Sequence, residues 1–208
     1  MKYLQEAEQG FDQISNDRKE TLQELALFIR EKLDENKEVK LIFICTHNSR
    51  RSHMSQIWAS VAAHYYQLPN VHTFSGGTEA TAFNPRAVAA LRRTGLTINK
   101  MTKGNNPRYQ VQLDGNDLVE EAFSKKYDDP ANPQEGFAAI MTCSQADEAC
   151  PFVPGAALRI SLPYDDPKEA DGTPQEAIRY DERSKQIATE MLYLLKQVKS
   201  NITSRNTN

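Results

Sequence analysis

Long apolar runs and cysteines are both scarce in this chain of 208 residues. No stretch is long and apolar enough to span a bilayer, so we expect no membrane partner. The first eight residues lack the apolar core of a signal peptide. The three cysteines, without a targeting segment, suit a reducing compartment in which thiols do chemistry. We therefore expect a cytoplasmic protein.

An excess of positive charge is also absent. The chain has 25 Lys and Arg residues against 28 Asp and Glu residues, a net charge of −3 and a pI near 5.9. These values argue against nucleic acid or an anionic membrane as the main partner. The length and a hydrophobic content of 39% suffice for one good core, and a second full domain is not expected.

Short β-branched runs alternate with amphipathic segments along the chain. This alternation implies parallel strands joined by right-handed crossovers. The strands are predicted at 39–44, 71–75, 137–143 and 157–161, and the helices at 17–35, 52–66, 84–93 and 174–200. The first helix, with Asn16 or Asp17 as its cap, is expected to pack on the sheet as a structural layer.

The predictions divide the chain into one domain and its additions. The parts are a helical extension, the domain and a polar, disordered tail, at residues 1–38, 39–200 and 201–208. Residues 99–136 are a predicted insert, in which 109–113 alternates like a strand that enters a turn at Asp114-Gly115. The insert is either a flap over the site or an ordinary solvated excursion.

The segment 41–52 carries the strongest chemical signal. A buried strand ends at Cys45, a polar loop follows, and Arg51 and Ser52 open a helix. In an open α/β sheet this crevice binds anions. Loop amides can form a nest for an oxyanion, and the same field stabilises a thiolate. Arg51 suits bidentate contact with two oxygens, and Ser52 could cap the helix or donate to the thiolate. The candidate oxyanion-binding residues beside Arg51 are Thr46, His47, Asn48, Ser49, Arg50 and Ser52.

Two further cysteines follow the third predicted strand. Because Cys45 and Cys143 both end strands of a parallel sheet, they could be neighbours in space. Cys150 lies seven residues after Cys143. On a regular helix this spacing is about 10.5 Å along the axis, whereas a disulfide needs Cα atoms within about 7 Å. A helical segment would therefore have to unwind before the two could bond. Two buried small residues in a helical turn are the alternative.

A departing oxygen needs a proton, usually from a carboxylic acid on a loop. Two identical tetrapeptides compete for this role, Tyr127–Pro130 and Tyr164–Pro167. The second follows the fourth strand and lies at the same edge as Cys45. The first precedes a strand and should enter from the opposite edge, unless its loop folds back. We predict Asp166 as the catalytic acid, with Asp165 as a helper or a surface charge, and the first tetrapeptide as a solvated turn.

No pattern indicates a metal or a tightly bound cofactor. The C-x6-C spacing is not that of a zinc site, and the histidines at 47, 53, 64 and 72 show no ligand pattern. His53 and His64 are expected on the surface of helix 52–66.

Several motifs together resemble those of the low-molecular-weight tyrosine phosphatases. They are Cys45-x5-Arg51-Ser52 with Asn48 in its loop, Ser75-Gly76-Gly77, Asn84-Pro85 and a late Asp-Pro. Within that superfamily, the chain resembles the thioredoxin-coupled arsenate reductases in Thr142-Cys143-x6-Cys150-Pro151 and Asp165-Asp166-Pro167. The resemblance covers about residues 39–98 and 137–198. It implies a three-layer α/β fold, with a four-stranded parallel sheet between helices.

The resemblance also implies a reaction. Cys45 attacks arsenate, Arg51 and the loop amides hold its oxygens, and Asp166 protonates the departing oxygen. Cys143 then attacks the Cys45–arsenic adduct and releases arsenite, and Cys150 attacks Cys143. Thioredoxin, the implied external reductant and partner, reduces the resulting disulfide. The substrate is then a small oxyanion, arsenate or phosphate.

Two alternatives remain open at this point. A low-molecular-weight phosphatase would act on phosphotyrosine or a small phosphoester through a phosphocysteine at Cys45, and the two later cysteines would be dispensable. A non-enzymatic anion- or redox-sensing protein is the third interpretation. The presence of both Arg51 and Asp166 argues against it.

Overall fold

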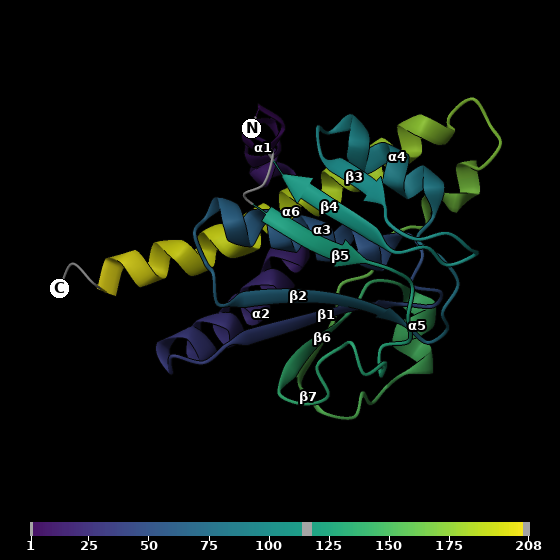
Figure 1. The fold of residues 1–208 in the computed structure, drawn as a ribbon. Helices are drawn as coiled ribbons and strands as arrows, with labels where there is room; N and C mark the ends of the chain where they lie inside the picture. The colour runs from purple at the N-terminus through teal and green to yellow at the C-terminus, as the bar shows by residue number, and fades with distance from the viewer. Residues whose placement is uncertain (1, 114–117, 206–208) are drawn as a thin grey trace.

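The computed structural model describes residues 2–113 and 118–205 and contains two separate sheets (Figure 1). The larger sheet has four parallel strands in the order β2-β1-β6-β7. Their bounds are β1 (Val39–Cys45), β2 (Val71–Gly77), β6 (Phe137–Met141) and β7 (Ala156–Ser161). The prediction of an α/β fold on a four-stranded parallel sheet is confirmed.

The strand register brings Cys45 and the residues that follow β2 and β6 to one edge of this sheet. Cys45 at the end of β1 pairs with Gly77 at the end of β2. On the other side Ile44 pairs with Met141, and the Thr142 amide donates to the Ile44 carbonyl oxygen at 2.7 Å. The carboxyl ends of three neighbouring strands therefore meet around Cys45.

Helices cover both faces of the parallel sheet, but unequally. On one face lie α3 (Arg51–Tyr65) and α6 (Glu176–Arg205), with α1 (Lys2–Glu8), α2 (Asn16–Asp34) and α4 (Pro85–Arg93) packed on α6. On the other face lies the short α5 (Ser144–Ala149), near the ends of β1 and β6. Two 3-10 helices, η1 (Phe11–Gln13) and η2 (Pro167–Ala170), complete the helical elements of the described residues.

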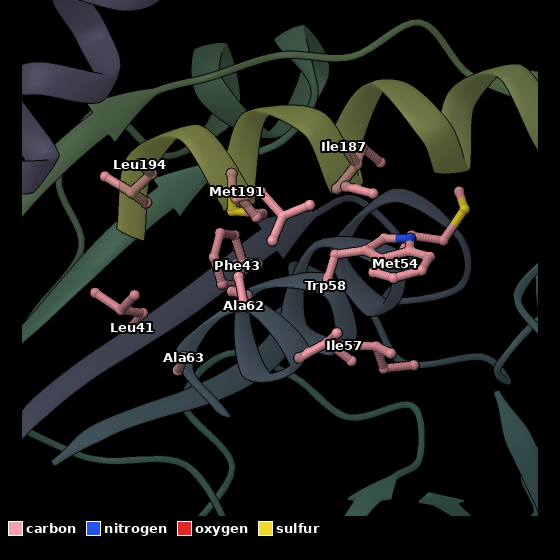
Figure 2. Packing of buried hydrophobic residues seen from close by; sticks show 14 of the residues in the cluster. Leu41, Phe43, Met54, Ile57, Trp58, Ala62, Ala63, Ile187, Met191 and Leu194 are labelled. Carbon is pink, nitrogen blue, oxygen red and sulfur yellow. The ribbon is translucent and has the colours of Figure 1, made fainter. Parts of the chain in front are cut away.

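Alternate residues of β1 enter two different hydrophobic clusters. Leu41 and Phe43 pack with α3 and α6, as Figure 2 shows for Trp58 and Met191. The opposite face of the sheet packs around Ile42, Ile44, Phe137, Ala139 and Met141, together with Cys45 and Cys143. The loop that follows Cys45 is thus attached to a strand that is buried on both faces, which fixes its starting point.

Helix α3 is buried along almost its whole length. It contacts β1 and β2 on one side, α6 on a second and the smaller sheet on a third. Small residues such as Ala59, Ala62 and Ser55 let these neighbours approach closely. A helix buried on all sides has no polar stripe, which explains why its sequence pattern misled the surface prediction for His53 below.

The N-terminal extension joins the core through α6. Helix α2 packs mainly on α6 and only in part on the sheet, contrary to the predicted packing. Tyr3 of α1 stacks on Trp58, with ring centroids 5.2 Å apart. Ser15, not Asn16 or Asp17, is the residue that precedes α2, because its extended backbone (φ −62°, ψ 157°) marks the turn into the helix.

The predicted insert contains most of a second sheet. Its antiparallel strands are β3 (Thr97–Lys100), β4 (Tyr109–Leu113) and β5 (Leu118–Ala122), in that order. The strand predicted at 109–113 is confirmed. The turn predicted at Asp114-Gly115 lies outside the described residues. β3 begins before the predicted boundary at residue 99.

After β5 the chain folds back to the carboxyl edge of the parallel sheet. The Gly77 amide donates to the Lys125 carbonyl oxygen, and the Tyr127 amide donates to the Gly77 carbonyl oxygen, each at 2.9 Å. The tetrapeptide Tyr127–Pro130 therefore lies at the same edge as Cys45, and the opposite-edge prediction is wrong. The physical reason is the β4–β5 hairpin, which reverses the chain.

Helix α6 continues to Arg205, so residues 201–205 are helical where a disordered tail was predicted. No Gly or Pro interrupts these residues to stop the helix. Among the described residues, no helix has the length and apolar character needed to cross a membrane.

Candidate active site

The thiol of Cys45 lies at the base of the loop between β1 and α3, and the residue is 4% exposed. Ser52 Oγ is 3.1 Å from its sulfur, and Asn48 Nδ2 donates to the same Ser52 oxygen at 2.9 Å. Because Asn48 uses a lone pair of that oxygen, the hydroxyl hydrogen is left for the sulfur. Of the two predicted roles for Ser52, the structure supports donation to the thiol, since Arg50 precedes the helix as its cap residue.

The carbonyl groups of the loop are held from outside. Thr78 and Glu79 amides donate to the carbonyl oxygens of Cys45 (3.1 Å) and Thr46 (2.8 Å), and the Asn84 amide donates to that of Ser49 (2.9 Å). The Ser49 hydroxyl donates to the Ala82 carbonyl oxygen, 2.8 Å away. The loop is therefore rigidly supported before any anion binds.

Gly77 is the position at which this support is closest. A Cβ atom there would lie 2.7 Å from the Asn48 nitrogen and from the Thr46 carbonyl oxygen, and it would also meet the Glu79 carbonyl oxygen. Backbone atoms cannot move aside as a flexible side chain would. The predicted glycine-rich strand end is thus a steric requirement of the loop.

The insert braces the same loop, which sequence reasoning missed. The Lys125 amide donates to Asn48 Oδ1 at 2.8 Å, and the Ser124 hydroxyl donates to the His47 carbonyl oxygen at 3.2 Å. Asn48 has a positive φ of 44°, a conformation that Asn adopts more readily than most residues. At Ser124 and Lys125 the insert is therefore neither a flap over the site nor a solvated excursion. It supports the loop after Cys45 from the side. The His47 side chain is half-exposed, 3.7 Å from Glu79.

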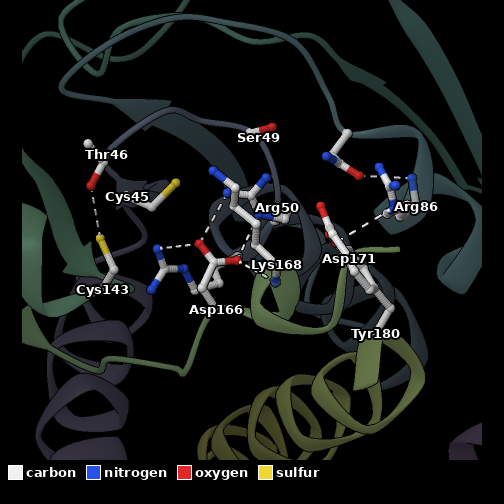
Figure 3. A network of polar contacts seen from close by, with 12 residues as sticks. Cys45, Thr46, Ser49, Arg50, Arg86, Cys143, Asp166, Lys168, Asp171 and Tyr180 are labelled. Atoms are coloured by element: carbon white, nitrogen blue, oxygen red, sulfur yellow. Dashed lines mark hydrogen bonds and ion pairs between the residues drawn. The ribbon is translucent and has the colours of Figure 1, made fainter. Parts of the chain in front are cut away.

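Two consecutive arginines, Arg50 and Arg51, converge on Asp166. Figure 3 shows Arg50 beside Asp166. Arg50 Nε and Nη2 donate to its two oxygens at 2.8 and 3.1 Å. Arg51 Nη2 lies 2.9 Å from Asp166 Oδ2, and Arg51 Nη1 donates to the Tyr164 carbonyl oxygen at 3.0 Å. Arg50 was predicted as an oxyanion-binding residue, and its side chain is engaged by the predicted acid in this structure.

The charge state of Asp166 follows from these neighbours. Burial alone would raise its pKa, but the hydrogen bonds and charges of Arg50 and Arg51 outweigh burial and lower the pKa below 3.8. Asp166 is therefore a carboxylate at neutral pH in this state of the site. Adjacent arginines at the start of a buried helix were the sequence signal that called for such a counter-ion.

Cys143 and Cys150 lie at the two ends of α5, and both are free thiols. Cys143 is buried, and the Ala146 amide donates to its sulfur at 3.4 Å. The Thr46 hydroxyl is 3.5 Å from the same sulfur, which links Cys143 to the loop that follows Cys45 (Figure 3). Cys150 is partly exposed. The segment is helical when reduced, as the spacing argument assumed.

Comparison with known proteins gives a consistent picture. No family model matches the chain. An arsenate reductase from Bacillus licheniformis is 32% identical over 136 residues, which cover 65% of this chain and 79% of the relative. The chain belongs to the arsenate reductase family. A second arsenate reductase, from Halalkalibacterium halodurans, is 29% identical over 68% of this chain and 82% of its own length.

Solved structures agree on the fold. A mutant of YwlE from Bacillus subtilis superposes with a TM-score of 0.53 and 18% identity, over 78% of this chain and 99% of that chain. A low-molecular-weight protein tyrosine phosphatase from T. tengcongensis gives 0.52 and 13%, over 76% and 99%. The chain therefore has the fold of the low-molecular-weight phosphatase superfamily, as the motifs predicted.

His53 is buried, contrary to the surface prediction. Its ring stacks on Phe83 at 4.2 Å between centroids, and the residue is fully enclosed. Burial, together with the charge of Lys125, lowers the pKa of His53 to about 3. It is therefore neutral at physiological pH and packs as an aromatic residue beneath the insert.

A second polar cluster stands behind the Asp166 loop and had no sequence signal. Arg18 of α2 donates to both oxygens of the buried Glu190 at 2.7 and 2.6 Å and to the Pro163 carbonyl oxygen at 3.0 Å. The Tyr164 hydroxyl donates to Glu190 Oε2 at 2.8 Å. Arg18 is more than a hundred residues from Pro163 and Glu190 in sequence, so only the fold brings them together.

Over 2–113 and 118–205, no group of three or more His, Cys, Asp or Glu side chains is arranged to hold a metal ion. The chemistry that the arrangement offers is nucleophilic, with a thiol, two guanidinium groups and a carboxylate in one place.

Proposed function

We propose that the chain reduces arsenate to arsenite with Cys45, Cys143 and Cys150, and that thioredoxin restores the thiols. Membership in the arsenate reductase family supports an enzyme that acts on an oxyanion. The observation that carries the thiol sequence is the 3.5 Å contact between Thr46 Oγ1 and Cys143 Sγ, because Thr46 is the residue after Cys45.

The first step is attack of the Cys45 thiolate on arsenic. An S–As bond forms, an As–O bond breaks, and the departing oxygen leaves as water. The Ser52 hydroxyl supports the thiolate, and Arg51 with the amides of Thr46 to Arg50 would hold the remaining oxygens. Asp166, a carboxylate that pairs with Arg51, would accept a proton from a retained As–OH group and pass it to the departing oxygen.

The second step transfers two electrons. The Cys143 thiolate attacks the Cys45 sulfur, a disulfide forms, and the S–As bond pair stays on arsenic, so As(V) becomes As(III) arsenite. The Ala146 amide and the Thr46 hydroxyl both contact the Cys143 sulfur and would hold it in position for this attack.

The third step passes the disulfide outward. The Cys150 thiolate attacks Cys143, which frees the Cys45 thiolate. Cys143 and Cys150 flank the six residues of α5, and their disulfide needs Cα atoms within about 7 Å, so the helix must unwind. Unwinding exposes the new disulfide, and a thioredoxin dithiol reduces it by exchange.

The test is arsenate-dependent NADPH oxidation with thioredoxin and thioredoxin reductase. We expect turnover by the wild type, and its loss in Cys143→Ser and in Cys150→Ser. The matched control is Ser144→Ala, an exposed residue on the same helix, which should keep wild-type turnover. Turnover that persists in either cysteine variant would contradict the cascade.

A phosphatase is the second candidate, because Cys45 and Arg51 are also the residues that a phosphocysteine mechanism uses. A phosphoester would form a phosphocysteine at Cys45 and be released by water. In that case aryl phosphate hydrolysis would be equal in the wild type, Cys143→Ser and Cys150→Ser, with no arsenate turnover in any of them.

A further inference from the structure

Asp166 is surrounded by four hydrogen-bond donors. Its Oδ1 accepts from Arg50 Nε at 2.8 Å and from the Lys168 amide at 3.1 Å. Its Oδ2 accepts from Arg50 Nη2 at 3.1 Å and pairs with Arg51 Nη2 at 2.9 Å. A carboxylate has about four acceptor positions, whereas a protonated carboxyl group must donate a hydrogen. The geometry of the donors therefore selects the ionised form.

Arg50 is the arginine whose contacts with Asp166 oxyanion binding by Arg51 would leave in place. In the proposed function Arg51 turns its donors toward the oxyanion. Arg50 instead directs two parallel hydrogen bonds at the two oxygens of Asp166, the strong fork arrangement of arginine and carboxylate. The Arg50 side chain is 11% exposed, so water competes little for this pair.

Other charged and titratable groups lie near the Arg50–Asp166 pair, and the net shift of the Asp166 pKa is still downward. Burial raises the pKa of Asp166, and the two arginines lower it further than burial raises it. On the exposed side, Asp165 pairs with Arg183 at 3.0 Å. The groups that face the Arg50–Asp166 pair are Cys45 and Arg51 at the loop, the Lys168 amide of η2 and Tyr180 of α6, whose hydroxyl donates to Asp171.

Arsenate and phosphoesters make different demands on this carboxylate. Dihydrogen arsenate carries two hydrogens, so thiolate attack can release water with both hydrogens supplied by arsenate itself. An ionised Asp166 can accept one hydrogen from a retained As–OH and pass it to the departing oxygen, and it ends unchanged. The departing oxygen of an aryl phosphate dianion carries no hydrogen, so a carboxylic acid must supply one.

We infer that Arg50 is a specificity-determining positioning residue, which holds Asp166 as a carboxylate and so favours oxyanions that carry their own hydrogens over phosphoesters. The inference rests on the proposed function, because it assigns the substrate class of the same site. It also gives a role to Arg50, the first of the two consecutive arginines, which oxyanion binding alone does not require.

The experiment compares Arg50→Gln and Arg50→Lys with the wild type in the full chain. The measured quantity is kcat/KM for phenyl phosphate hydrolysis and for thioredoxin-coupled arsenate reduction, between pH 5 and 8. The matched control is Arg93→Gln, whose guanidinium binds both oxygens of Asp181 at the surface, at 2.9 and 3.0 Å from Nε.

In Arg50→Gln we expect the fall of kcat/KM for phenyl phosphate hydrolysis with rising pH, the alkaline limb of the pH profile, to shift to higher pH by about one unit. The ratio of phosphatase to reductase activity at pH 7 should then rise about ten-fold, since one pKa unit is a factor of ten in acid form. Arg50→Lys, which keeps the charge, should move the limb less, and Arg93→Gln not at all. A limb and a ratio in Arg50→Gln equal to those of the wild type would overturn the inference.

A second readout does not depend on activity. The carboxyl 13C resonance of Asp166, assigned by its loss in Asp166→Asn, should titrate at higher pH in Arg50→Gln than in the wild type. If the wild type does not turn over arsenate, the proposed function fails, while this titration and the phenyl phosphate limb still test Arg50. If arsenate is reduced but the titration does not move, the inference alone fails.

Discussion

The sequence Tyr-Asp-Asp-Pro occurs twice in this chain and forms two different structures. At Tyr127–Pro130 it is a surface turn, in which Asp129 Oδ1 accepts from the Ala131 amide at 2.9 Å. At Tyr164–Pro167 the tyrosine is 3% exposed and Asp166 binds two arginines. Local preference is the same in both places, so the difference comes entirely from the surroundings.

Position along the edge of the sheet decides which copy meets the arginines. Both copies lie at the carboxyl edge, because the first is carried there by the insert and hydrogen bonds to Gly77 of β2. The second follows β7 and faces the start of α3, where Arg50 and Arg51 lie. The start of α3 is positive and buried, so it binds the Asp166 carboxylate of the second copy, whereas Asp129 of the first copy stays at the surface.

The largest expected effect separates the two copies by activity. Asp166→Asn should lower kcat/KM for arsenate reduction by about 100-fold or more, because proton transfer by a positioned side chain contributes about 10²–10⁴-fold. Asp129→Asn, the same change in the other copy, should stay within about two-fold of the wild type. The coupled NADPH assay measures both, and a urea midpoint near that of the wild type shows that each variant is folded. Equal effects of the two changes would remove Asp166 from the mechanism.

The tyrosines of the two copies should differ in stability. Tyr164→Phe removes a buried donor from Glu190, which should cost about 1–2 kcal/mol of unfolding free energy. Tyr127→Phe removes a hydroxyl from a partly exposed ring and should cost less than about 0.5 kcal/mol. Urea denaturation gives both values. A larger loss in Tyr127→Phe would show that the buried cluster around Glu190 does not stabilise the Asp166 loop.

Sequence reasoning succeeded where the determining residues are close together in the chain. The loop from Cys45 to Ser52 and the parallel strands follow from local pattern and spacing. Asp166 was chosen by an argument about sheet edges, and the structure brings both copies to that edge, so the argument alone does not distinguish them. Two contacts distinguish the second copy from the first. Arg50 binds Asp166, 116 positions away, and Glu190 binds Tyr164, 26 positions away.

The same limit explains the errors in the helix and the insert. The surface of α3 that carries His53 is covered by the insert, whose path cannot be inferred from α3 itself. Lys125 and Asn48 are likewise 77 residues apart. Partners at such separations are set by topology, and one sequence without its fold contains no direct record of them.

Acid should weaken the second copy selectively. Because the arginines hold the pKa of Asp166 below 3.8, its ion pairs stabilise the fold above that pH and are lost as pH falls through the lowered pKa. The urea midpoint of the wild type should therefore fall more steeply below about pH 4 than that of Asp166→Asn. The Asp129→Asn profile is expected to run parallel to the wild type. Parallel wild-type and Asp166→Asn profiles would argue against a stabilising Arg50–Asp166 pair.

The smallest expected effect concerns the two aspartates that precede the compared pair. Asp165 binds Arg183 at 3.0 Å, but its side chain is 88% exposed, so water screens the pair. Asp165→Asn should therefore change the unfolding free energy by no more than about 0.5 kcal/mol, and the exposed Asp128→Asn by about as little. Their activities should also match, because neither side chain reaches the two arginines of α3 in the structure's contacts. A loss of arsenate turnover in Asp165→Asn alone would mean that Asp165, and not only Asp166, serves the departing oxygen.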